Sequence, residues 1–165
     1  LNVSMTASIT GVMEMLRRVD VVKAMPFAPW RVVTFEVFAQ SLYGIAVVWI
    51  PCFVLLALKP AWWSVLAGAC VLSLGLSFLI CSAVATVSLL FPDEDDATQT
   101  QFRRLMMLLG IVIACAPPVG AFIGLGALGV PWWLAALPAL ALAAGIAAAI
   151  VLFASGLYAG FNPSE

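Results

Sequence analysis

The chain has 165 residues, of which 65% are hydrophobic and 9% are charged, and its formal net charge is −1. Soluble globular domains carry about 25% charged residues, so this composition excludes a water-soluble domain and places most of the chain in lipid. The near-zero net charge excludes the basic surface that binds nucleic acid. The sequence has no histidine and pairs no nucleophile with a base, so we expect no catalytic residue, metal site or bound cofactor in this chain.

The first predicted element is an amphipathic helix at residues 12–25, VMEMLRRVDVVKAM. Its apolar residues recur at helical spacing and form one stripe, with most of the charges opposite or on a flank. The segment is too short and too charged to span a bilayer, so we expect it to lie in the interface plane. Pro26 and Pro29 end it, because proline disfavours helical geometry in the preceding residue. Pro29 is also suited to begin the next helix.

Four segments are apolar over roughly the 20 helical residues that cross a hydrocarbon core of about 30 Å. In chain order they cover residues 32–58, 62–91, 105–128 and 132–158. Helix is the expected form, because unpaired backbone groups in lipid are costly. We therefore expect an all-α polytopic membrane protein with a four-helix region at 32–160. A cytoplasmic amphipathic segment at 1–31 precedes it and a cytoplasmic tail at 161–165 follows.

The segments that connect the four spans lie alternately on the two sides of the membrane, and most of the basic residues fall on one side. Arg17, Arg18, Lys23, Arg31, Arg103 and Arg104 lie on that side, and Lys59 lies on the other. Loops rich in lysine and arginine stay in the cytoplasm. We therefore expect both termini and the 92–104 loop in the cytoplasm, with the chain in the plasma (inner) membrane.

Polar and proline residues inside the spans are candidates for function. Glu36 and Gln40 are the strongly polar side chains within a predicted span, and an intramembrane ionisable group is a functional hypothesis by default. Glu36 is only about 7.5 Å along the helix from Arg31, so interfacial placement with a salt bridge or snorkelling explains it better. Pro117 and Pro118 must bend or break the third span, either as a static kink or as a hinge.

Small residues favour packing over a substrate path. Ser73, Ser77, Cys81 and Ala85 line one face of the second span, and GAFIG at 120–124 is a Gly-x-x-x-Gly motif. Such residues allow helix backbones to approach closely in membranes. The four cysteines, Cys52, Cys70, Cys81 and Cys115, are interpreted as small helical residues rather than a disulfide framework or zinc site. The acidic run at 93–96 lacks the spacing of a calcium loop and is expected to be solvated.

Residues 17–40, RRVDVVKAMPFAPWRVVTFEVFAQ, resemble a segment of ATP-binding-cassette (ABC) exporter permeases. In those proteins a helix ending in a D-x-x-K-x-x-P pattern precedes a membrane span. The stretch SLLFPDEDDATQTQFRR at 88–104 and the tail YAGFNPSE at 158–165 are similar to later parts of such permeases. These permeases usually have six or more spans, so the resemblance implies that this four-span chain is the C-terminal portion of a permease, or a reduced permease.

The resemblance also implies the partners. A cytoplasmic ATPase subunit would bind ATP and Mg²⁺, and a second permease half or a second copy would complete the pathway. The residues implied in ATPase contact are Arg17, Arg18, Asp20, Lys23 and Pro26. The chain has no phosphate loop of the form G-x-x-x-x-G-K-[ST], so ATP hydrolysis would belong to the partner and the chain would not be an enzyme. The alternative is a non-transporting tetraspan scaffold or assembly factor.

Overall fold

The computed structural model describes residues 28–91 and 97–160. Within these ranges the chain forms four α-helices and one short 3-10 helix. They are α3 (Pro29–Leu58), η1 (Pro60–Trp62), α4 (Trp63–Leu90), α5 (Ala97–Ala127) and α6 (Trp132–Gly160). Four stretches of these helices are long and apolar enough to cross a membrane, which confirms the expected all-α, four-span class. The predicted amphipathic helix and the 161–165 tail lie outside the described residues.

The helix boundaries follow local chemistry. α3 begins with Pro29 at its first positions, where the missing N–H of proline has no intrahelical partner to lose. α5 begins at Ala97 rather than near residue 105, because glutamine, arginine and alanine favour helix outside the apolar stretch. In the turn before α6, Gly129 has a φ of +85°, a left-handed conformation that glycine adopts without steric cost.

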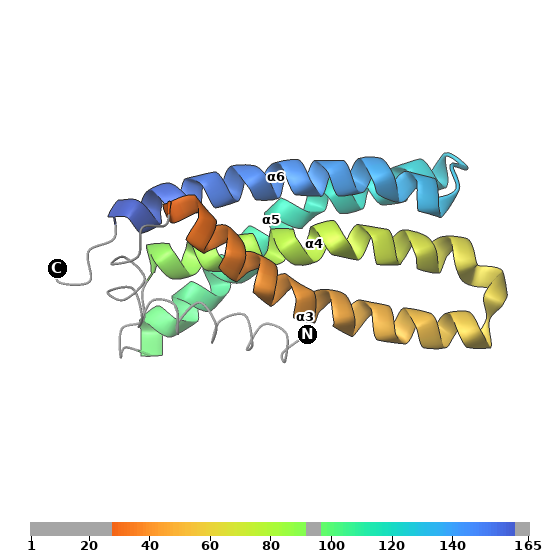
Figure 1. The fold of residues 1–165 in the computed structure, drawn as a ribbon, viewed down its shortest axis with the longest axis horizontal. Helices are drawn as coiled ribbons and strands as arrows, with labels where there is room; N and C mark the ends of the chain where they lie inside the picture. The colour runs from red at the N-terminus through yellow and green to blue at the C-terminus, as the bar shows by residue number, and fades with distance from the viewer. Residues whose placement is uncertain (1–27, 92–96, 161–165) are drawn as a thin grey trace.

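The helices run alternately up and down (Figure 1). The start of α3, the end of α4, the start of α5 and the end of α6 share one end of the bundle, which we name the loop end. The opposite end, named the turn end, holds η1 and residues 128–131. A chain of four membrane crossings with both ends on one side has this arrangement.

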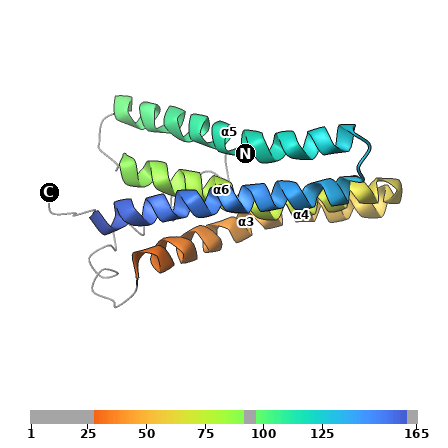
Figure 2. The ribbon, with the colours of Figure 1, turned by 90° about the horizontal axis from the view of Figure 1, so that it is seen from above.

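The pair formed by α4 and α6 is the centre of the bundle. These two helices share the most extensive contact, and α3 and α5 lie on opposite sides of the pair (Figure 2). Over its most apolar stretch, 56% of α4 is buried inside the chain, compared with 11% for α3 and for α5. The outer faces of α3 and α5 are therefore available to lipid or to another protein.

Small residues hold the centre together. In α6, Ala136, Ala139, Ala143 and Ala147 are fully buried. In α4, a Cβ added at Gly75 would lie 2.8 Å from the Leu140 side chain and 2.9 Å from Ala143 Cβ. A Cβ at Gly68 would lie 2.7 Å from the carbonyl oxygen of Trp132. Close approach of this kind drives helix association in lipid, where burial of apolar surface contributes little.

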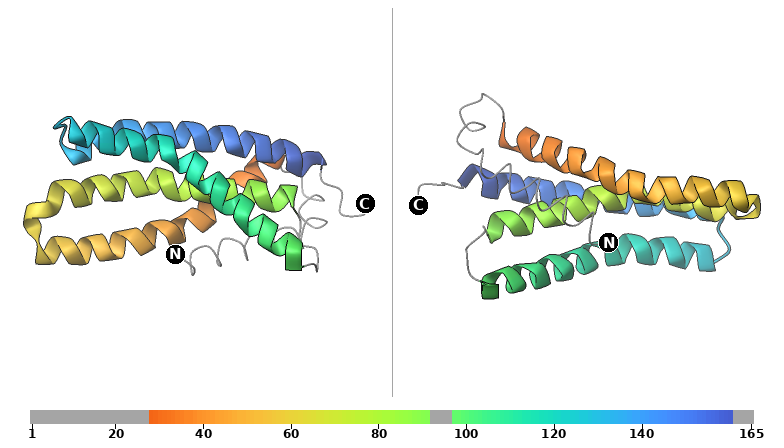
Figure 3. Two further views of the ribbon diagram at one scale, coloured as in Figure 1. Left: turned by 180° about the vertical axis from the view of Figure 1, so that it is seen from behind. Right: turned by 90° about the horizontal axis from the view of Figure 1, so that it is seen from below.

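The two prolines of the third span bend it without breaking it. α5 is one helix from Ala97 to Ala127 with Pro117 and Pro118 inside it. Its loop-end half runs diagonally across the bundle, and its turn-end half runs beside α6 (Figure 3). Interior proline removes a backbone hydrogen bond and is the commonest cause of a sharp bend.

Candidate functional site

The five residues predicted to contact an ATPase lie outside the described residues. They are Arg17, Arg18, Asp20, Lys23 and Pro26. The described chain begins at Ala28, directly before α3, at the loop end. The described residues nearest to this predicted contact are therefore the first turns of α3 and the helix ends that pack against them.

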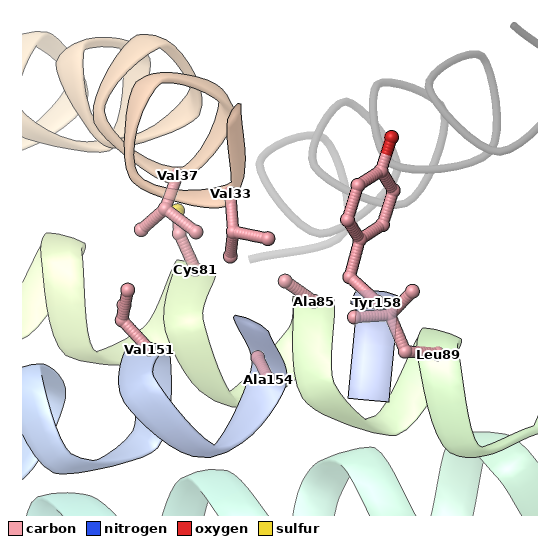
Figure 4. Packing of buried hydrophobic residues seen from close by; sticks show 8 residues of the cluster. All are labelled: Val33, Val37, Cys81, Ala85, Leu89, Val151, Ala154 and Tyr158. Atoms are coloured by element: carbon pink, nitrogen blue, oxygen red, sulfur yellow. The ribbon is translucent and has the colours of Figure 1, made fainter. Parts of the chain in front are cut away.

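A buried apolar cluster joins three helices at the loop end, and we name it the loop-end cluster (Figure 4). It consists of Val33 and Val37 from α3, Cys81, Ala85 and Leu89 from α4, and Val151, Ala154 and Tyr158 from α6. Val33 and Val37 are each only 2% exposed. Because close-packed side chains transmit displacement rather than absorb it, a shift at the start of α3 would act on α4 and α6.

Two hydroxyl groups at the loop end lack partners among the described residues. Tyr158 Oη and Ser88 Oγ are buried and accept or donate no hydrogen bond there. Figure 4 shows the Tyr158 hydroxyl pointing away from the cluster. Nearby, Ser82 Oγ donates to the carbonyl of Phe78 at 2.7 Å, which is the usual solution for a hydroxyl within a helix. Buried polar atoms are normally bonded, so these two hydroxyls are exceptions among the described residues.

Glu36 and Gln40 form a pair on one side of α3. Gln40 Nε2 donates to Glu36 Oε1 at 3.0 Å, and both side chains are half-buried. The guanidinium of Arg31 lies over the Trp30 ring, 5.3 Å from its centroid. Interfacial placement of Glu36, with a salt bridge or snorkelling, stays a prediction, and the amide one turn away supplies a hydrogen bond to the carboxylate.

The small-residue face of α4 packs against α3, as predicted. Trp49 Nε1 donates to Ser73 Oγ and to the Cys70 carbonyl, each at 3.1 Å. One helical turn further on, a Cβ added at Gly44 would lie 3.0 Å from Ser77 Oγ. Cys81 and Ala85 continue this face into the loop-end cluster. The face of α4 predicted for packing is therefore the seam with α3.

The Gly-x-x-x-Gly motif of α5 has a different environment. A Cβ added at Gly120 or Gly124 would meet nothing within 4 Å, and the same holds at Gly145 of α6. The close helix packing expected at Gly120 and Gly124 does not occur within the described bundle. Sequence alone cannot identify which helix a small-residue face meets.

The two halves of α5 are held differently. In the turn-end half, Phe122 packs on Trp132 with ring centroids 5.2 Å apart, and a Cβ at Gly126 would clash with the same ring. In the loop-end half, Phe102 contacts Phe91 edge-on at 5.5 Å. Pro118 is fully buried, and Pro117 beside it is exposed. The prolines thus separate a half anchored to α6 from a half that meets the end of α4.

The cysteines hold one contact that sequence reasoning missed. The thiols of Cys52 in α3 and Cys70 in α4 lie close enough to interact, although no disulfide joins any of the four cysteines. No group of three metal-ligating side chains occurs among residues 28–91 and 97–160. The acidic run at 93–96 lies outside the described residues.

Comparisons with known proteins identify no relative. No family model matches the sequence, and searches of curated proteins and of solved structures find no significant match. A function for this chain must therefore be argued from its residues and their geometry.

Proposed function

We propose that the chain is a transmembrane permease subunit of an ABC-type exporter, or the C-terminal portion of one. Its partners would be a cytoplasmic ATPase, a second permease half or second copy, and the lipid bilayer. The observation that carries the proposal is the position of Ala28, Phe91 and Ala97 at one end of the bundle. The described parts of the two longer stretches that resemble exporter permeases therefore meet the same end of the bundle: residues 28–40 begin at the loop end, residues 88–91 finish there, and residues 97–104 begin there.

The charge distribution supports a cytoplasmic loop end. Among the described residues, Arg31, Arg103 and Arg104 belong to helix ends at the loop end. Lys59 lies at the turn end, with Nζ over the Trp62 ring at 5.2 Å. Tryptophan beside lysine is typical of a membrane interface, and an excess of arginine and lysine marks the cytoplasmic side. We propose that both termini face the cytoplasm, in the plasma (inner) membrane.

The proposed mechanism is mechanical. ATP and Mg²⁺ would bind the partner ATPase, and its closure would move residues 12–31 of this chain. That segment leads directly into α3, whose Val33 and Val37 belong to the loop-end cluster. The cluster would pass the movement to α4 and α6. Pro117 and Pro118 would let the loop-end half of α5 follow while its other half stays attached to Trp132.

The experiment that tests this proposal swaps two charges. In the variant Asp20→Lys, Lys23→Asp, net charge and helical pairing are unchanged, so a simple interfacial anchor should tolerate it. Like-charge contacts at a specific interface cost several kcal/mol. Since about 1.4 kcal/mol corresponds to a factor of ten, we expect copurification of the partner ATPase to fall by roughly tenfold or more at matched membrane abundance.

The control variant is Lys59→Asp, which reverses one charge at the turn end and should leave recovery unchanged. Equal recovery of the ATPase with the swapped variant, together with equal stimulated ATPase activity, would overturn the coupling role. Absence of any copurifying ATPase with the wild-type chain would favour the tetraspan scaffold.

A further inference from the structure

Two cysteines from neighbouring helices meet near the turn end. Cys52 lies in the last two turns of α3 and Cys70 in the third turn of α4. Their thiols lie close enough to interact, and both side chains are half-buried. One turn before Cys52, the indole N–H of Trp49 donates to the carbonyl of Cys70 at 3.1 Å. The same turns of α3 and α4 are therefore in contact beside both cysteines.

The pairing follows from the shape of the hairpin. The midpoint between Cys52 and Cys70 along the chain is Ala61, the central residue of η1. Trp49 and Ser73, which are hydrogen-bonded, have the same midpoint. Two antiparallel helices joined by a tight turn place residues opposite each other when they lie equally far from that turn. The two thiols are thus brought together by the backbone register of α3 and α4.

We propose that Cys52 and Cys70 form a reversible disulfide that joins α3 to α4 near the turn end. The oxidant is a disulfide, carried by a protein or a small molecule. The thiolate of one cysteine attacks a sulfur of the oxidant and displaces its other sulfur. The second cysteine attacks the mixed disulfide, so that the S–S bond forms between Cys52 and Cys70. The oxidant leaves as two thiols, which carry the two electrons and the two protons lost by the cysteines.

The other two cysteines are placed differently and provide internal controls. Cys81 is buried in the loop-end cluster, and Cys115 packs beside Leu79 and Ala143. A bond between Cys52 and Cys70 would fix α3 to α4 at one level and leave their loop-end turns free to move about it. With the orientation proposed above, the pair lies toward the side opposite the cytoplasm, where disulfides persist.

The test uses the full chain in membranes, without an ATPase, so its outcome is independent of the proposed transport function. Dithiodipyridine, a small membrane-permeant disulfide, is added, and remaining thiols are then blocked with N-ethylmaleimide. The digest is analysed by mass spectrometry without reduction. We expect a linked peptide pair containing residues 52 and 70 that dithiothreitol separates, with two molecules of pyridinethione released per pair and no stable adduct on either cysteine.

Matched variants isolate the pair. Cys52→Ser and Cys70→Ser should each leave the remaining cysteine of the pair as a stable mixed disulfide. The double variant Cys81→Ser, Cys115→Ser should give the same linked peptide as wild type. Stable adducts on both Cys52 and Cys70 of wild type would overturn the proposal. So would equal linkage of either cysteine to Cys81 or Cys115, or failure of both to react when the denatured chain reacts fully.

Discussion

α4 and α5 are helices of similar length, but α4 is largely buried inside the bundle and α5 lies on its surface. α4 contains no proline and is 56% buried over its most apolar stretch, whereas α5 contains two adjacent prolines and is 11% buried. The other two helices, α3 and α6, each contain one interior proline, Pro51 and Pro138. The chain therefore surrounds one helix of uninterrupted backbone hydrogen bonding with three helices that proline interrupts.

The side chains follow the same division. The buried positions of α4 include several glycines, serines and alanines, which allow neighbours to approach closely. The exposed positions of α5 include large apolar residues such as Leu105, Leu108 and Ile113. Large apolar groups on a helix surface suit acyl chains, whereas small residues suit helix contacts. α4 thus serves as the axis of the bundle, and α5 is one of its two outer helices.

Substitution of glycine by leucine should give the largest difference in stability between a variant of α4 and a matched variant of α5. Gly75→Leu inserts a side chain where even a Cβ lies 2.8 Å from Leu140 and 2.9 Å from Ala143. Overpacking of this kind costs about 3 kcal/mol, and we expect that loss in the free energy of unfolding, measured by denaturant titration in detergent micelles.

The matched variant is Gly120→Leu in α5, where an added Cβ meets nothing within 4 Å. It should leave stability unchanged or raise it slightly, since leucine is the better helix former. An equal loss in both variants would show that the open face of α5 is packed against another chain under the conditions of the measurement.

The prolines of α5 should affect activity more than stability. Pro117→Ala, Pro118→Ala restores two backbone hydrogen bonds and straightens the helix. If the bend is a hinge, abundance should stay near normal while transport-coupled ATP turnover falls roughly tenfold, equivalent to about 1.4 kcal/mol in the barrier. ATP turnover per assembled complex and membrane abundance are measured in parallel. Loss of abundance in step with activity would show a static kink instead.

Substitution of Trp49 should have the smallest effect on the free energy of unfolding, and it tests the hydrogen bonds between α3 and α4. Trp49→Phe removes the indole donor to Ser73 Oγ and to the Cys70 carbonyl. Interhelical hydrogen bonds in membranes contribute about 0.6 kcal/mol on average, so we expect a loss of that size in the same unfolding measurement. Trp63→Phe, at an exposed tryptophan of α4, is the control and should change little. Equal effects would mean that the indole bulk, not its hydrogen bond, holds the seam.

The spans were predictable from composition, because lipid leaves helix as the satisfactory backbone form for long apolar segments. The seam of Ser73 and Ser77 with α3 was predictable as packing, though the partner helix was not. The start of α5 at Ala97 was missed, because hydropathy marks where lipid begins and does not mark where a helix begins. Gln40 as the partner of Glu36 could not be predicted from charge, because the donor is a neutral amide one turn away.

The cysteine pair shows a further limit of local pattern reading. Cys52 and Cys70 were judged by motif spacing, which has no signature for residues on two different helices. Their equal distance from Ala61 was present in the sequence, but it became informative only when η1 was seen to reverse the chain within three residues. Contacts between helices depend on register, and register depends on the length of the turn.

The contact of Gly68 with Trp132 has a consequence for biogenesis. α3 with α4, and α5 with α6, are two hairpins that can each enter the bilayer as a unit. At the turn end, the hairpins touch where Gly68 of the first meets the backbone of Trp132 in the second. Trp132 in turn holds Phe122 and the turn-end half of α5. At the turn end, docking of the hairpins therefore uses a residue at the start of the fourth helix, so this contact can form only after that helix has begun to be synthesised.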